Sequence, residues 1–94
     1  MTAPHTIHPR QCLGARGVRG LTQREVAAAI GVSSSALSLF ERGKRQLSPD
    51  AMAQLIAFFQ AKRVTFWLDG LPGIYFETDD GRLEGISVCE DLLR

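Results

Sequence analysis

Hydroxyl and cationic side chains gather between residues 33 and 45 of this 94-residue sequence. Ser33, Ser34, Ser35 and Ser38 are followed by the basic run 42–45, Arg-Gly-Lys-Arg. Serine hydroxyls both donate and accept hydrogen bonds, while guanidinium and ammonium groups bind phosphate and guanine base edges. These groups are therefore suited to contact a nucleic acid. The ordinary alternative is a capped helix start that merely faces solvent.

The charge along the chain is divided in a way that agrees with this interpretation. Residues 1–47 contain seven Lys and Arg and two acidic residues, a net charge of +5. Residues 48–94 contain four Lys and Arg and eight acidic residues, a net charge of −4. The excess of basic residues in the N-terminal half suggests that this half binds a polyanion, and the excess of acidic residues in the C-terminal half suggests that it has a different function. Chance variation in a short chain is the alternative explanation.

The composition places the chain among soluble globular proteins. It has 45% hydrophobic and 22% charged residues, and its length suits one core rather than two. No stretch approaches the roughly 18 apolar residues of a membrane span, and the start lacks a secretory signal pattern. Cys12 and Cys89 make no disulfide framework. A cytoplasmic location is therefore expected.

Four helices are predicted to position these groups. The first, over about 10–18, has the weakest signal because two glycines lower its propensity. The second begins at Thr22 with Glu25 three residues later, a capping box, and ends at Gly31. Ser33 caps the third helix, and Gly43 ends it. The turn between the second and third helices is therefore short.

The fourth helix has the clearest amphipathic pattern, and the chain changes character after it. Ser48 caps this helix with Pro49 at its first position. Segments 64–68 and 74–78 are β-branched and aromatic, and the turn material between them predicts a β-hairpin. Residues 83–86 fit a third strand, whereas Ser87 and Glu90 fit the capping box of a terminal helix. The sequence leaves both open.

Three stretches together resemble the Xre and phage lambda-repressor-like family of DNA-binding domains. They are Leu21–Ala27, Ile30–Ser38 and Phe40–Arg45, and with Ser48-Pro49 the resemblance covers about residues 10–60. It implies a mainly α fold: a lambda-repressor-like helix-turn-helix bundle of four to five short helices, here with a C-terminal β-hairpin appendage. We expect a flexible arm over 1–9, the helix-turn-helix domain over 10–62, and a hairpin and tail over 63–94.

The resemblance also implies roles for individual residues. The expected base-reading positions are Ser34, Ser35, Ser38, Leu39 and Arg42. The expected phosphate contacts are Gln23, Ser33, Lys44, Arg45 and Arg16, and Arg16 with Glu41 matches a structural ion pair of the family. Serine hydroxyls can donate or accept a hydrogen bond and so do not discriminate among the bases. Leu39 lies at a position where many relatives have a long polar residue. The target sequence is therefore not predicted.

The implied function is a sequence-specific, double-stranded DNA-binding transcriptional regulator, expected to be a homodimeric repressor of a palindromic operator. The expected dimer interface is the aromatic hairpin, with Phe66, Trp67, Tyr75 and Phe76, by strand addition. In the alternative arrangement, the hairpin folds back as a lid on the helices. The alternative function is an antitoxin-like module whose acidic C-terminal half binds a toxin or another protein.

Catalytic and metal chemistry are not indicated. His5, His8 and Cys12 have metal-like spacing but lack a fourth ligand, so an incidental tail is expected. Cys89 has no histidine in its half of the chain and is expected to be a small buried side chain rather than a nucleophile. Asp79 and Asp80 beside a glycine are turn formers. We therefore expect no enzyme, no metal and no cofactor.

Overall fold

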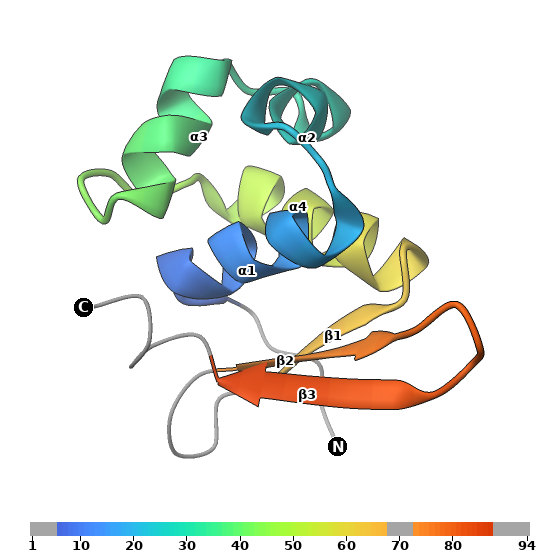
Figure 1. The fold of residues 1–94 in the computed structure, drawn as a ribbon. Coiled ribbons are helices and arrows are strands. Elements are labelled where there is room, and N and C mark those ends of the chain that lie inside the picture. The colour runs from blue at the N-terminus through green and yellow to red at the C-terminus, as the bar shows by residue number, and fades with distance from the viewer. Residues whose placement is uncertain (1–5, 68–72, 88–94) are drawn as a thin grey trace.

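The fold is four helices followed by a small antiparallel sheet (Figure 1). This computed structural model describes residues 6–67 and 73–87. The elements are α1 (Pro9–Arg19), α2 (Gln23–Ile30), α3 (Ser34–Glu41), α4 (Pro49–Ala61), β1 (Val64–Trp67), β2 (Gly73–Glu77) and β3 (Leu83–Ser87). The mainly α helix-turn-helix fold predicted from the sequence is confirmed.

The helix ends follow the local chemistry of the chain. Thr22 and Glu25 form the predicted capping box of α2, in which each side chain accepts a hydrogen bond from the other residue's backbone N–H. Gly31 ends α2 with φ of 76°, a left-handed conformation that side chains with a Cβ rarely adopt. The hydroxyls of Ser33 and Ser48 accept from the backbone N–H groups of Ala36 and Ala51. These caps fix where α3 and α4 begin.

One apolar core joins the helices to the sheet. It receives side chains from the residue Ile7 before α1, from all four helices and from β1 and β2: Ile7, Cys12, Ala15, Val26, Ala27, Ile30, Leu37, Phe40, Met52, Leu55, Ile56, Phe59, Val64, Phe66 and Ile74. Among its members, the small residues Ala15 and Ala27 are 0% and 1% exposed. Burial of this set supplies the main driving force for folding.

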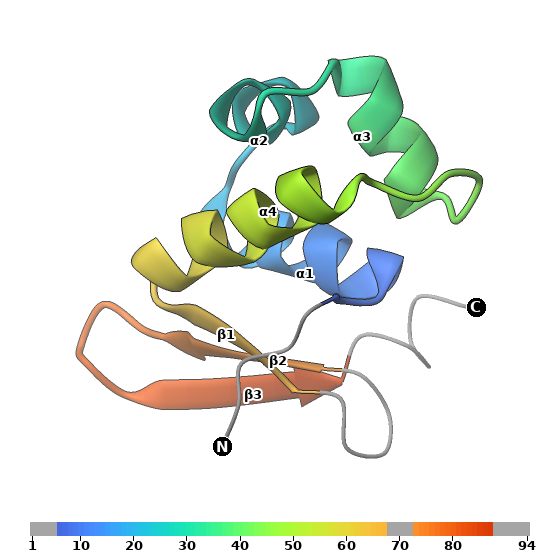
Figure 2. The ribbon, with the colours of Figure 1, turned by 180° about the vertical axis from the view of Figure 1, so that it is seen from behind.

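The sheet packs beneath α1 and α4, on the side away from α2 and α3 (Figures 1 and 2). Its strand order is β1-β2-β3, with both neighbouring pairs antiparallel. Phe66 packs edge-to-face on Phe59 of α4, with ring centroids 6.0 Å apart. The fully buried Gln11 of α1 donates from Nε2 to the carbonyl of Gly73 in β2 at 2.8 Å. The sheet is therefore part of the same folded body as the helices.

The appendage differs from the predicted hairpin, because residues 83–87 form a third strand. One of the two open alternatives for this stretch is therefore confirmed. The terminal helix of the other alternative would have occupied residues 88–94, which lie outside the described part of the chain.

Of the predicted flexible arm over 1–9, the structure describes residues 6–9, and two of these residues make structural contacts. Ile7 is 4% exposed and belongs to the core. His8 caps α1: its Nδ1 accepts from the backbone N–H of Arg10, and its own N–H donates to Gln11 Oε1. Pro9 occupies the first helical position. The sequence analysis considered only the absence of an apolar period over these residues and did not identify this cap.

Three of the four aromatic residues of the predicted dimer interface have described side chains, and two of these pack against the core. Phe66 is 5% exposed within the core, so it is not available to a partner in this structure. Phe76 packs against the core from the same face of the sheet, under the guanidinium of Arg19. Tyr75 is exposed on the other face, and the Trp67 side chain lies outside the described ones. The inner face of the sheet therefore matches the lid alternative.

Candidate nucleic-acid interface

Helices α2 and α3 are joined by a tight turn that holds them against one another. The Val32 N–H donates to the carbonyl of Ala27 at 3.0 Å across the left-handed Gly31. Leu37 and Phe40 of α3 are buried, which fixes one side of this helix against the core. The opposite side of α3 faces outward (Figure 1). A helix supported in this way can enter a DNA major groove.

The candidate base-reading side chains meet in one place. A shallow hollow of about 360 Å³ is lined by Gln23, Ser34, Ser35, Ser38, Leu39 and Arg42. The structure thus brings all five predicted base-reading residues together with one predicted phosphate contact from α2. Ser34, Ser35 and Arg42 are exposed, and Ser38 and Leu39 are half-buried. The hollow combines hydroxyl groups, an amide, an apolar side chain and one fixed positive charge.

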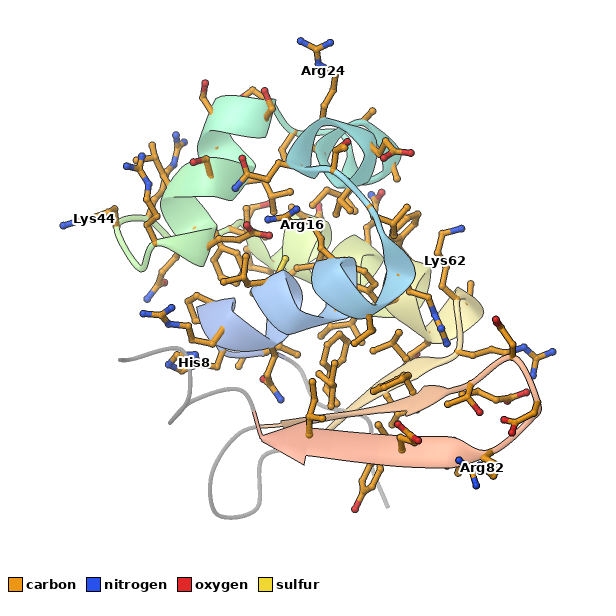
Figure 3. All side chains as sticks on the ribbon, viewed as in Figure 1. His8, Arg16, Arg24, Lys44, Lys62 and Arg82 are labelled. Carbon is orange, nitrogen blue, oxygen red and sulfur yellow. The ribbon has the colours of Figure 1, made fainter. Side chains whose placement is uncertain are left out.

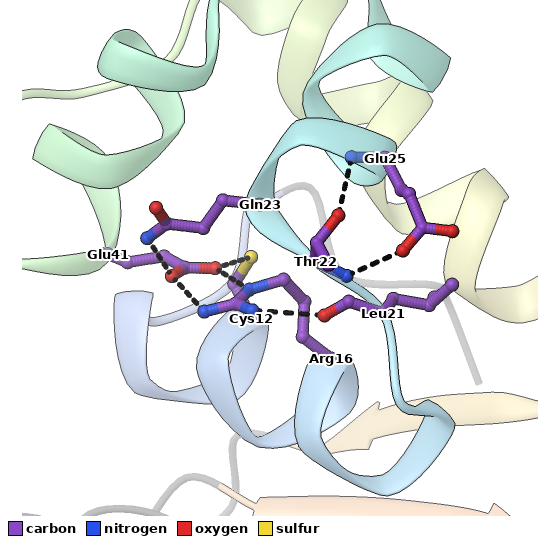
Figure 4. A network of polar contacts seen from close by, with 7 residues as sticks. All are labelled: Cys12, Arg16, Leu21, Thr22, Gln23, Glu25 and Glu41. Carbon is purple, nitrogen blue, oxygen red and sulfur yellow. Dashed lines mark hydrogen bonds and ion pairs between the residues drawn. The ribbon is translucent and has the colours of Figure 1, made fainter.

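A buried carboxylate lies directly behind this surface (Figure 4). The Glu41 side chain is 3% exposed. Arg16 donates to both of its oxygens, from Nε to Oε2 at 2.7 Å and from Nη2 to Oε1 at 2.8 Å. Gln23 Nε2 donates to Oε1 at 2.9 Å, and the Cys12 thiol donates to Oε2 at 3.1 Å. One carboxylate therefore joins α1, α2 and α3.

The network keeps Glu41 ionised inside the protein. Burial alone disfavours the charge, but hydrogen bonds from Arg16, Gln23 and Cys12 outweigh it and hold the pKa of Glu41 below its usual range. Burial and the adjacent Glu41 charge raise the pKa of the Cys12 thiol, so this thiol stays protonated. Cys12 therefore acts as a hydrogen-bond donor and not as a nucleophile.

The predicted phosphate contacts divide into three groups. Lys44 and Arg45 are exposed in the loop after α3, and Lys44 points away from the body of the protein (Figure 3). Arg16, by contrast, is directed inward, and its Nη1 also donates to the carbonyl of Leu21 at 3.0 Å. Gln23 and Ser33 each make one structural hydrogen bond and remain at least partly exposed.

The metal-like spacing near the N-terminus does not form a cluster in the described part of the chain. His8 caps α1 and Cys12 faces Glu41, so the two side chains serve different structures. His5 and Cys89 lie outside the described residues.

Three supporting contacts escaped prediction from the sequence. They are the Cys12 bond to Glu41, the Gln11 bond to β2, and a group of bonds from Arg19 to the carbonyls of Lys62, Arg63 and Glu77. The capping box at the start of α1 did have a local signal, the pattern His8-Pro9-x-Gln11, because a glutamine three residues after a cap completes such a box. The three supporting contacts join residues 29 to 62 positions apart in the sequence, so no local pattern predicts them.

The fold and this surface define a helix-turn-helix domain. A family model for helix-turn-helix proteins of the Xre and lambda-repressor type matches residues 15–66, which is more than half of the chain. The protein belongs to this family, whose members are DNA-binding regulators. No curated protein matches the sequence. None of the helices in the described part of the chain is long and apolar enough to cross a membrane.

Proposed function

We propose that this protein is a homodimeric repressor that recognises a palindromic operator by placing α3 in the DNA major groove. The observation that carries the proposal is the single hollow that Gln23 shares with the outward side of α3. Base-contacting groups and a phosphate-contacting group must lie on one face to reach one duplex. The residues proposed for these two roles line one hollow, and none of the described residues that line it is acidic.

The phosphate contacts of this proposal come from elements on either side of α3. Gln23 is the first residue of α2, so its amide and the helix N-terminal N–H groups can donate to the same phosphate. Its amide nitrogen carries two hydrogens, and the bond to Glu41 uses one. Lys44 and Arg45 hold the backbone from the following loop. Arg16 positions Gln23 through Glu41. Of its five N–H groups, three bond Glu41 and Leu21, and the other two are the ones proposed to share the nearby phosphate.

Base discrimination in this proposal depends mainly on Arg42. This residue lines the hollow directly after the last residue of α3, and its guanidinium can donate two hydrogen bonds to a guanine. The Ser34, Ser35 and Ser38 hydroxyls accept or donate and so favour no single base. Leu39 offers apolar contact to a thymine methyl. The operator should therefore contain at least one guanine in each half-site.

Two copies are needed because one domain makes few contacts. Nonspecific binding at physiological salt has dissociation constants of about 10⁻⁴ to 10⁻⁶ M, too weak to select one site in a genome. Two domains whose α3 helices lie about 34 Å apart engage both halves of a palindrome. The family match does not favour the alternative of an antitoxin-like module.

Fluorescence anisotropy tests this proposal. Binding to the duplex upstream of the protein's own gene is compared with binding to a scrambled duplex, at low and physiological salt, because small regulators often control their own synthesis. Preference for the native duplex that survives physiological salt supports base readout. Failure to bind any duplex even at low salt contradicts DNA recognition by α3.

A further inference from the structure

A second hollow lies beside the loop that follows α3, and the proposed function does not use it. It has a volume of about 820 Å³ and is lined by residues at the start of α1, by the loop 43–47 and by residues at the start of α4. We call it the loop groove. Sites for small molecules have volumes of about 300–1,000 Å³, so the loop groove is large enough to hold a ligand.

Four apolar side chains from different parts of the chain line the loop groove. Ile7 precedes α1, and Phe40 belongs to α3. Leu47 belongs to the loop, and Met52 belongs to α4. Ile7, Phe40 and Met52 are buried core residues, and Leu47 is half-buried against the same core. An apolar chain that lies along these side chains therefore loses its contact with water, which favours binding.

The charge around the loop groove is positive. Lys44 and Arg45 line it and are exposed, and none of the described residues that line it is acidic. Pro9 and Pro49, the first residues of α1 and α4, also line it, so the positive ends of two helix dipoles border the groove. The backbone N–H of Gln46 donates to no acceptor in the described part of the chain. The groove is therefore complementary to an anion.

We propose that the loop groove binds a small amphiphilic anion, a carboxylate that carries an apolar chain. The chain packs on Leu47 and Met52, and the carboxylate binds the guanidinium of Arg45, which can donate two parallel hydrogen bonds to it. Lys44 adds to the positive field. A short carboxylate leaves the apolar side chains uncovered, and an uncharged chain leaves the cations unpaired, so each should bind more weakly.

Ligand binding opposes DNA binding, and this part of the inference rests on the proposed function. Lys44 and Arg45 are the phosphate contacts that we propose for the loop after α3. A carboxylate on Arg45 occupies donors and neutralises charge that a phosphate otherwise meets. Coupling between two sites is reciprocal, so the ligand weakens DNA binding by the factor by which DNA weakens ligand binding. The loop groove is thus an effector site.

An NMR titration of the free protein with octanoate tests the site without DNA. The amide signals of Gly43, Gln46 and Leu47 should shift and saturate at millimolar octanoate. Each buried methylene group raises affinity about fourfold, so octanoate should bind about tenfold more tightly than hexanoate. Octan-1-ol, which lacks the charge, should bind more weakly than octanoate. Equal affinities of hexanoate and octanoate, or shifts that do not saturate, overturn the proposal.

A leucine pair tests the apolar part of the site. Leu47→Ser removes apolar contact in the loop groove and should weaken octanoate binding about fivefold. Leu83→Ser makes the same change on β3, where the side chain is 71% exposed, and should have no effect. Circular dichroism checks that both variants fold. Equal octanoate affinity of the two folded variants contradicts packing of the chain on Leu47.

A matched pair of double variants tests the charged part. Lys44→Ala with Arg45→Ala should weaken octanoate binding about tenfold. Arg24→Ala with Lys62→Ala removes the same charge from exposed residues that lie away from Lys44 (Figure 3), so octanoate affinity should stay at the wild-type value. Equal losses in the two double variants would mean that only net charge attracts octanoate and would overturn the site.

Anisotropy on duplex DNA tests the coupling. Saturating octanoate should weaken DNA binding by the wild-type protein about fivefold, and acetate at the same concentration should not. DNA affinity that is unchanged by saturating octanoate overturns the effector role. A wild-type protein that binds octanoate in the NMR titration but binds no duplex contradicts the DNA proposal alone.

Discussion

Glu41 is the residue that most closely connects the core with the proposed DNA surface. It is a buried carboxylate, and burying a charge is costly unless it is paired and hydrogen-bonded. Arg16, Gln23 and Cys12 supply four donated hydrogen bonds from two other helices. The orientation of Gln23 therefore depends on a carboxylate that is itself almost fully buried.

Glu41→Gln should destabilise the fold by about 3 kcal/mol, because it leaves the Arg16 guanidinium without its counter-charge in a largely buried position. Urea denaturation at pH 7, followed by circular dichroism, measures this change in the free energy of unfolding. Glu25→Gln alters an exposed carboxylate of similar chemistry and serves as the control. A loss no larger than that of the control would contradict the role given to Glu41.

The stability that Glu41 contributes is expected to depend on pH, and the Glu41→Gln variant tests this. The pKa of Glu41 is lower in the folded state than in the unfolded chain, so its ionisation contributes stability that is fully present above about pH 4.3. This contribution is lost as the pH falls through the folded-state pKa. The difference in unfolding free energy between wild type and Glu41→Gln should therefore shrink between pH 5 and pH 3. A constant difference over that range would argue against an ionised Glu41.

Ser35→Glu should abolish operator preference while leaving the fold intact, because Ser35 is exposed and lines the hollow. A carboxylate there faces acceptor-rich base edges and phosphates, which should weaken specific binding about tenfold or more. Gln54→Glu adds the same charge on the exposed side of α4, outside the hollow. If folded Ser35→Glu binds the operator as tightly as Gln54→Glu does, α3 is not in the groove.

At the scale of elements, the helices were predictable and the sheet only in part. The residues that start and stop helices act locally: Thr22 with Glu25, and Gly31, mark the ends of α2 within a few residues. The third strand depends on pairing with β2, and the local sequence of residues 82–94 suited a helix equally well. Likewise, the alternation of side chains along β1 does not show which face of the strand meets α4. The sequence therefore favours a dimer interface for Phe66, whereas the structure has this side chain in the core.

Arg19 fastens the sheet to the helices at the end of α4. Its guanidinium donates to the carbonyls of Lys62 and Glu77 at 2.7 and 2.9 Å and lies 5.9 Å from the Phe76 ring centroid. Arg19→Ala should lower the free energy of unfolding by about 1–2 kcal/mol, since these carbonyls lose a charged donor. Arg19→Lys should recover only part, because an ammonium lacks the planar fork.

Urea denaturation measures both Arg19 variants, and anisotropy on duplex DNA provides the control. DNA affinity should be unchanged, because Arg19 is not among the residues that line the hollow. Equal stability of wild type and Arg19→Ala would contradict the fastening role.

At the scale of the whole molecule, the charge is divided between the two halves of the chain. The +5 half contains the proposed DNA surface, and the −4 half contains the sheet. The described residues 73–87, which contain β2 and β3 on the side away from α3, have four acidic residues and one arginine. Phosphate repels this side, so the field of the molecule favours approach to DNA with α3 leading.

Lys44→Ala combined with Arg45→Ala should weaken binding to all duplexes alike. Each lost phosphate contact lowers the slope of log affinity against log salt by about 0.9, so the slope should fall by up to about two. Anisotropy titrations from low to physiological salt give this slope. An unchanged slope would mean that the loop after α3 does not face DNA.

Selection of binding sites from a pool of random duplexes tests the central claim most directly, because the protein itself picks out the operator sequence from all the duplexes offered. We expect enrichment of a palindrome whose half-sites are centred about one helical turn apart and contain a guanine. The same selection with Ser35→Glu should not enrich that sequence. A pool that stays random with the folded wild-type protein would contradict sequence recognition by α3.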